Sequence, residues 1–258
     1  MSSSPPPLTA PPLLGVWLGR RPYSAVYHLQ KALLEQRKQG AGSDVVLLVE
    51  HDPVITLGRG TRAGHLLASP AVLERRGVEV VVSDRGGDAT LHAPGQLVAY
   101  PIVALPPTQR DVRRYVRGLA NVMRALVAPL GIDGGAIDQY IGLWVDTQQP
   151  HHWPGEAHVQ RPAKIGAIGV RISRWVTMHG FALNVSTDLS LFQLIVPCGI
   201  AEHGVTSVTE LGGEGVELAE LAQHAHRLLA HQLERRAVDL WDATGDSLER
   251  VTTRLIPG

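Results

Sequence analysis

The stretch "KIGAIGVRISRWVTMHGFALNV", residues 164–185, contains two runs of β-branched and apolar residues separated by a short polar break. β-Branched residues favour strands, and two strands joined by a two-residue connection form a hairpin. We therefore predict strands over 164–172 and 175–185. Ser173 and Arg174 are expected to form the turn, although this pair is not the Asn-Gly or Asp-Gly that such turns favour.

Further helices and strands are predicted on both sides of this hairpin. Apolar and β-branched runs indicate strands over 44–51, 78–84, 97–105 and 141–146. Apolar residues at helical spacing indicate helices over 22–40, 111–130 and 218–237. The polar, proline-broken segment 147–163 indicates a long surface loop. Without a repeat or a composition shift, we expect a single α+β domain with helices packed on a mixed sheet.

The composition excludes several classes of function. The chain has 258 residues, of which 44% are hydrophobic and 19% charged, which is typical of a soluble globular protein. Its formal net charge is zero, so the total charge does not favour nucleic acid or an anionic membrane as a partner. Only 5% of the residues are aromatic, which argues against base-stacking surfaces. No apolar run approaches the length of a membrane-spanning helix.

The N-terminal segment and the cysteine content indicate the compartment. Residues 1–14 lack the basic and apolar regions of a signal peptide, so we expect a disordered lead-in followed by one domain over 15–258. Cys198 is the only cysteine, which rules out a disulfide within the chain. Together these features predict a cytoplasmic protein.

Cys198 is a candidate nucleophile. It lies between Pro197 and Gly199 in "LIVPCGIAEHGVTSV", residues 194–208, and these neighbours indicate an irregular loop. Loops on a rigid scaffold commonly present reactive groups. The alternative is a small buried side chain that only packs. The residues themselves leave both interpretations open.

Lys164 is a candidate partner for such a nucleophile. The chain has only three lysines, and the other 21 of its 24 Lys+Arg residues are arginine. A thiol has an ordinary pKa of about 8.5, and a nearby ammonium group stabilises the thiolate. Lysine can also accept a proton, whereas arginine stays protonated in proteins. The alternative is a lysine at a strand end whose ammonium group reaches water.

A glycine-rich turn, "RGGDATLHAPGQ" at residues 85–96, follows the strand predicted over 78–84. Its glycines allow backbone N–H groups to approach a ligand closely. It matches neither the P-loop nor the G-x-G-x-x-G motif, so nucleotide binding has no support from a motif.

Four stretches occur in a fixed order along the chain: "RGGDATLHAPGQLVAYPIV", "KIGAIGVRISRWVTMHGFALNV", "PCGI" and "VTSV". Between about residues 50 and 210 the chain resembles the lipoyl(octanoyl) transferase family, the octanoyl-acyl carrier protein:protein N-octanoyltransferases. The resemblance implies the fold of the catalytic domains of biotin and lipoate protein ligases. In that fold a larger mixed sheet and a smaller sheet are surrounded by helices.

The resemblance also implies an activity. Cys198 would carry the acyl group as a thioester and Lys164 would be its partner, without ATP, a cofactor or a metal. The donor would be octanoyl-acyl carrier protein. The acceptors would be lysines of the lipoyl domains of 2-oxoacid dehydrogenase complexes and of the glycine cleavage H protein. The implied substrate contacts are Arg85, Gly86, Gly87, Asp88, Ala89, Thr90, Leu91, His92, Ala167, Ile168, Gly169, Gly180, Phe181 and Ala182.

The chain departs from the family pattern at three positions and in one loop. Leu91 replaces an aromatic residue, Ala93 replaces glycine, Gly166 replaces alanine, and the 147–163 loop is longer. We expect these differences to affect the preferred acyl length and the position of the loop, and to leave Cys198 and Lys164 unaffected.

Several other side chains have alternative interpretations. His92 could contact the acyl carbonyl or a backbone group, and His179 is expected to be a satisfied histidine at a sheet end. Arg110, Arg113, Arg114 and Arg117 have the spacing of one helix face, which would suit an acidic carrier protein or would simply be solvated.

Three rival functions are considered. A metal site could use His151, His152 and His158, or His224, His226 and His231, but neither group has partners at metal-ligand spacing. An ATP-dependent lipoate or biotin ligase would share the fold but needs no cysteine. A carrier-binding protein without catalysis would form a complex with the carrier and no covalent adduct.

Overall fold

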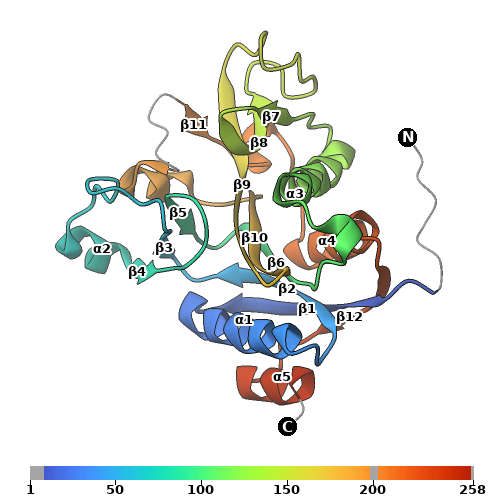
Figure 1. The fold of residues 1–258 in the computed structure, drawn as a ribbon. Coiled ribbons are helices and arrows are strands. Elements are labelled where there is room, and N and C mark those ends of the chain that lie inside the picture. The colour runs from blue at the N-terminus through green and yellow to red at the C-terminus, as the bar shows by residue number, and fades with distance from the viewer. Residues whose placement is uncertain (1–8, 198–202, 257–258) are drawn as a thin grey trace.

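The computed structural model describes residues 9–197 and 203–256, so Cys198 lies outside the described residues. Over these residues the chain forms a single α+β domain with a nine-stranded mixed sheet and a separate three-stranded sheet (Figure 1). The large sheet has the order β12-β1-β2-β6-β10-β9-β8-β7, with β11 paired to β9, and the small sheet has the order β4-β3-β5. This confirms the fold class implied by the sequence.

The strands and helices have the following bounds. The large sheet contains β1 (Pro12–Arg21), β2 (Asp44–His51), β6 (Gln96–Ile102), β7 (Gly135–Ile137), β8 (Tyr140–Asp146), β9 (Pro162–Ser173), β10 (Val176–Asn184), β11 (Gly204–Val205) and β12 (Arg236–Asp242). The small sheet contains β3 (Val54–Leu57), β4 (Glu79–Val82) and β5 (Ala89–His92). The helices are α1 (Tyr23–Lys38), α2 (Pro70–Arg76), α3 (Val112–Val127), α4 (Leu218–Gln232) and α5 (Leu248–Leu255).

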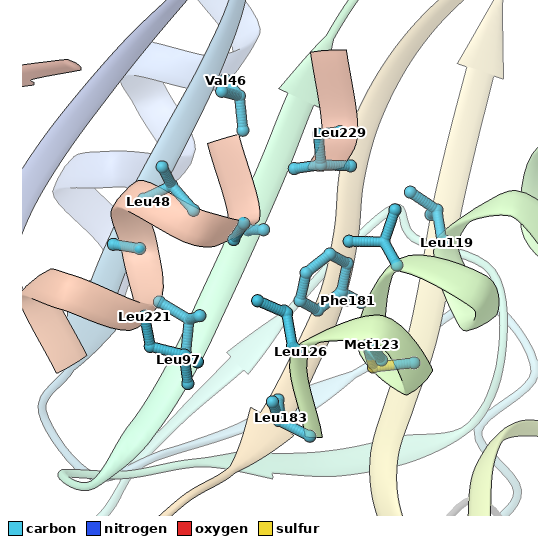
Figure 2. Close-up of a cluster of buried hydrophobic side chains, with 14 of the residues drawn as sticks. Val46, Leu48, Leu97, Leu119, Met123, Leu126, Phe181, Leu183, Leu221 and Leu229 are labelled. Carbon is cyan, nitrogen blue, oxygen red and sulfur yellow. The ribbon is translucent and has the colours of Figure 1, made fainter. Parts of the chain in front are cut away.

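Helices cover both faces of the large sheet, with α1 and α5 on one face and α3 and α4 on the other (Figure 1). Alternation along β2 directs Val46 and Leu48 toward α3 and α4, whereas Val45 and Leu47 pack with α1. Figure 2 shows the first of these two cores, where Phe181 of β10 lies among leucines of the two helices. The sheet therefore separates two hydrophobic cores.

The predicted hairpin is β9 and β10, but its turn differs by one residue from the prediction. Val176 pairs with Ser173, so the turn residues are Arg174 and Trp175 rather than Ser173 and Arg174. Both turn residues have positive φ, 49° and 62°, as the primed turns that match strand twist require. Trp175 is held there by its carbonyl, which accepts a hydrogen bond from the N–H of Leu105 at 2.8 Å.

Two predicted boundaries are corrected. The lead-in predicted over 1–14 overlaps β1, which begins at Pro12 and buries Leu13 completely. Proline can occupy the first position of a strand because no ladder hydrogen bond is lost there, so Pro12 does not mark a disordered segment. The helix predicted over 218–237 ends at Gln232, because Glu234 adopts a φ of 55° and the chain turns into β12.

The remaining predicted elements are present, with adjusted ends. The loop predicted over 147–163 lies between β8 and β9 and is two residues shorter, because β9 begins at Pro162. Asp111 begins α3 by accepting a hydrogen bond from the N–H of Arg114 at 2.9 Å. In the part of the chain that the structure describes, no helix has both the length and the hydropathy needed to cross a bilayer.

Candidate functional site

A cavity of about 340 Å³ lies beside β9 and β10, bounded by α3, β8 and the glycine-rich turn. Among the residues that the structure describes, it brings together all of the predicted site residues except Ala89 and Leu91, and Cys198 lies outside the described residues. The predicted residues that line it are Arg85, Gly86, Gly87, Asp88, Thr90, His92, Lys164, Ala167, Ile168, Gly169, Gly180, Phe181 and Ala182.

Ala89 and Leu91, two of the predicted substrate contacts, do not line the cavity. These residues belong to β5, where side chains alternate between the two faces of the small sheet. Thr90 and His92 line the cavity, whereas Ala89 and Leu91 are fully buried in the core formed with α2. Ala93 belongs to the same core, so the family differences at Leu91 and Ala93 affect packing under the small sheet.

At Gly166, the third position that differs from the family pattern, a neighbouring side chain fills the space beside the glycine. A Cβ placed on Gly166 would lie 2.5 Å from the sulfur of Met123. Met123 of α3 therefore occupies the space that an alanine methyl group would need.

Lys164 is buried, with a relative exposure of 5%, so the interpretation as a strand-end lysine reaching water is wrong. Its Nζ donates a hydrogen bond to the carbonyl of Ile141 at 3.0 Å and lies 4.9 Å from the ring centroid of Trp144. A Cβ on Gly142 would lie 3.1 Å from the Lys164 Cε and 2.6 Å from the Gly166 carbonyl oxygen. Glycine at 142 therefore leaves room for the lysine side chain.

Both flanks of segment 198–202 lie beside Lys164. Pro197 and Lys164 line the same small cavity of about 20 Å³. On the other flank, Val205 pairs with Lys164 between β11 and β9, and the N–H of Thr206 donates to the Lys164 carbonyl at 3.0 Å. The five residues between Pro197 and His203 include Cys198, which is not itself described.

Arg85 holds the glycine-rich turn in place. Its Nη2 donates to the carbonyl oxygen of Thr56 at 2.6 Å, and its Nε donates to the Thr56 hydroxyl at 3.0 Å. A Cβ on Gly58 would lie 2.4 Å from the carbonyl oxygen of Gly87, so the turn packs directly against a second glycine segment. Arg85 lines the cavity, which is compatible with the predicted contact with substrate. Its guanidinium also binds Thr56 of β3, so the side chain has a structural role as well. Thr56 and Gly58 were not predicted, because only the fold brings them to the turn.

His92 is a neutral acceptor at the cavity wall. The Gln96 amide donates through Nε2 to the Asn184 Oδ1 at 2.8 Å, which leaves its Oε1 to accept from the His92 Nδ1 at 2.7 Å. Burial lowers the pKa of His92 to about 3. At neutral pH its Nε2 therefore carries a lone pair and can accept a hydrogen bond.

His179 is buried and satisfied, as predicted, but it lies within β10 rather than at the sheet end. It has a φ of 59°, and its Nε2 donates to the Asp84 Oδ1 at 2.9 Å. Hydrogen bonding by His179, opposed by burial and assisted by Arg171, lowers the pKa of Asp84 to about 2. Asp84 is therefore ionised at neutral pH and fixes the His179 ring at the cavity wall.

Sequence reasoning missed several residues that line the cavity. Tyr23 begins α1, Tyr100 lies in β6, and Val112 and Val116 lie on α3. The remaining missed residues are Gln139, Tyr140, Ile141 and Val170. Each lies in or beside an element predicted only as core or surface, and no local signal distinguishes them. Tyr100 is fixed by its hydroxyl, which lies 2.9 Å from the Nε2 of His51.

The cavity lining along β9 and β10 combines polar and apolar groups. Val170, the β9 partner of His179, is six residues from Lys164, or about 20 Å at the usual strand rise. Tyr23, His92, Tyr100 and His179 contribute polar groups to the lining. Ile168, Phe181 and Ala182 contribute apolar walls on the strands between Lys164 and Val170.

Two of the histidines weighed as metal ligands bind backbone groups instead. His226 donates through Nε2 to the carbonyl of Leu13 at 3.0 Å, and His151 contacts the carbonyl of Gly131. Within residues 9–197 and 203–256, no group of three or more His, Cys, Asp or Glu side chains could hold a metal ion.

The fold and the site define an α+β domain in which a cavity beside two central strands is lined by a buried lysine. The comparisons with known proteins make this specific. The lipoyl protein ligase A/B catalytic domain family matches residues 22–230, and the chain belongs to this family.

Relatives named octanoyltransferase match most of the chain. One from Chloroflexus aggregans is 48% identical over 214 residues, which is 83% of this chain and 90% of that protein. One from Myxococcus xanthus is 46% identical over 206 residues, which is 80% of this chain but 55% of that protein. The resemblance to the octanoyltransferases that the motifs indicated is thereby confirmed.

Solved structures confirm the fold. A bipartite lipoate protein ligase from Thermoplasma acidophilum, described with its E2 lipoyl domain, aligns with a TM-score of 0.66 at 16% identity, covering 93% of this chain and 91% of that one. A lipoate-protein ligase A bound with ATP aligns with a TM-score of 0.64 at 16% identity, covering 92% and 93%.

Proposed function

We propose that this protein transfers an octanoyl group from octanoyl-acyl carrier protein to a lysine of lipoyl domains, as an early step of protein lipoylation in the cytoplasm. The octanoyltransferase relatives support the acyl group and the reaction class. The position of Lys164 carries the proposed mechanism, because its amine is buried beside both flanks of the segment that contains the only cysteine.

The first step would convert the thioester of the donor into a thioester of Cys198. The Cys198 thiolate attacks the carbonyl carbon of the donor, a new S–C bond forms, and the donor's S–C bond breaks to release the carrier thiol. Lys164 would take the proton from the Cys198 thiol and give it to the departing carrier sulfur, which returns Lys164 to the neutral amine before the second step. The exchange is close to isoenergetic, so it needs no ATP.

In the second step, the lysine amine of a lipoyl domain attacks the octanoyl thioester. An amide forms and the Cys198 thiolate leaves. The incoming amine has an ordinary pKa of about 10.4, so it must lose a proton before it attacks. Lys164 would help to remove that proton, and the conversion of thioester to amide is downhill. The proposed acceptors are lipoyl domains of 2-oxoacid dehydrogenase complexes and the glycine cleavage H protein.

The cavity supports binding of the acyl chain. Its methylene groups would lie against Ile168 and Phe181, where burial is worth about 0.8 kcal/mol per methylene, or roughly 5 kcal/mol for the chain. The oxyanion needs N–H donors. The glycine-rich turn and the cysteine offer three candidates, the N–H groups of Gly86, Gly87 and Cys198. The Gly86 N–H already donates to the Val170 carbonyl at 3.0 Å, so the proposed donors are those of Gly87 and Cys198.

The proposed function and the ligase alternative differ in their substrates. Purified protein is incubated with an unmodified lipoyl domain and either octanoyl-acyl carrier protein without nucleotide, or free octanoate with ATP. We expect an octanoyl-lipoyl domain in the first mixture. Product in the second mixture alone would identify an ATP-dependent ligase. Stable association with the carrier and no product in either mixture would identify a carrier-binding protein.

A further inference from the structure

The cavity opens beside the N-terminal half of α3. Val112 of α3 and Ile141 of β8 line the cavity and are nevertheless 47% and 60% exposed. Large apolar side chains that are exposed at the rim of a cavity are suited to contact with a partner protein. Val116, one helical turn after Val112, also lines the cavity, so this side of α3 faces the opening.

Arg113 and Arg117 follow these valines on the exposed face of α3. They are four residues apart, so their side chains share one helix face. Both residues are exposed, and among the described residues neither forms an ion pair. Asp111 is the nearby carboxylate, and it is engaged as the cap of α3.

The other two arginines of the predicted basic face are engaged elsewhere. Arg114 pairs with Glu234 at 3.2 Å, on the side of α3 that faces α4. Arg110 precedes α3, and its guanidinium lies 5.7 Å from the ring centroid of Trp175. The prediction of a face formed by four arginines is therefore corrected to a pair, Arg113 and Arg117.

We propose that Arg113 and Arg117, together with Val112 and Ile141, form the docking surface for an acidic protein that delivers the acyl thioester. This proposal rests on the proposed function. Surface carboxylates of the donor would pair with the two guanidinium groups, while its acyl arm passes between the two apolar side chains into the cavity. The donor is favoured over the acceptor because its chain must enter the cavity, whereas the acceptor amine needs only the thioester carbonyl.

Charge complementarity acts mainly on the encounter rate, and salt weakens it. Removing both charges therefore affects delivery by a carrier protein and not the chemistry of a small thioester. The variant R113Q/R117Q tests this. The control R114Q/R250Q removes the same charge from two arginines that pair with Glu234 and Asp246.

The experiment measures acylation of the enzyme under single-turnover conditions, with either octanoyl-acyl carrier protein or octanoyl-N-acetylcysteamine as donor. In low salt we expect R113Q/R117Q to lower the second-order rate constant for acylation by octanoyl-acyl carrier protein by roughly tenfold. The small thioester should react at the wild-type rate, the control variant should match wild type with both donors, and high salt should remove the difference.

Other results would overturn the docking proposal. Equal losses with both donors would indicate a structural defect, and equal losses in both variants would indicate an effect of total charge. A loss confined to transfer onto the lipoyl domain would assign the surface to the acceptor. If wild-type protein is acylated by neither donor, the proposed function itself fails.

Discussion

Replacing Lys164 by methionine is expected to lower kcat for octanoyl transfer by about 10²–10⁴-fold, the usual contribution of a general base. Methionine is similar in length and unbranched, and it packs readily in apolar surroundings. It keeps the buried volume beside Trp144 but removes the group that accepts a proton. The measurement is the steady-state rate of octanoyl-lipoyl domain formation, with thermal unfolding as a check on the fold.

Lys164→Arg separates the charge of Lys164 from its role in proton transfer. Arginine keeps a positive charge, which favours a thiolate, but it does not accept a proton. We expect this variant to retain more activity in enzyme acylation than in transfer to the amine. A Lys164→Met variant that stays folded and keeps the wild-type kcat would contradict the assigned role.

Replacing Gly180 by alanine is expected to destabilise the protein by about 1–3 kcal/mol or more, the usual cost of overpacking. The added Cβ would lie 2.1 Å from the carbonyl oxygen of Ala99 and 2.8 Å from the Cδ of Pro101. Both atoms belong to β6, the strand that pairs with β10, so neither can rotate away as a flexible side chain could. The strands must separate, and the cavity wall moves with them.

Urea unfolding of Gly180→Ala and wild type measures this effect. Gly245→Ala is the matched control, because nothing lies within 4 Å of a Cβ placed there. We expect the control to stay close to wild type. If the two variants have the same free energy of unfolding, the close packing of β10 against β6 is incorrect.

The parts of the fold predicted from sequence are those with a long, uninterrupted pattern. The helix over 111–130 has apolar residues at helical spacing, and the hairpin over 164–185 has two long β-branched runs. Within the small sheet, β4 was predicted, whereas β3 and β5 were missed because they have only four residues each, too few to show a period. β12 was missed because the helical pattern of α4 continues past its last residue, Gln232.

The site was predictable where its residues are contiguous in a motif. The turn at 85–88 and the strand residues 167–169 and 180–182 line the cavity as expected. Tyr23 and Tyr100 could not be predicted, because tertiary packing alone brings the start of α1 and the middle of β6 to the same cavity. Leu91 lies away from the cavity for a local reason, since a segment interpreted as a turn contains a strand whose side chains alternate.

The most direct test of the central claim is the intact mass of the protein after mixing with octanoyl-acyl carrier protein without nucleotide. We predict a mass increase of one octanoyl group that hydroxylamine removes and that is absent from Cys198→Ala. An adduct that persists in Cys198→Ala, or transfer to the lipoyl domain at the wild-type rate by that variant, would contradict the thioester mechanism.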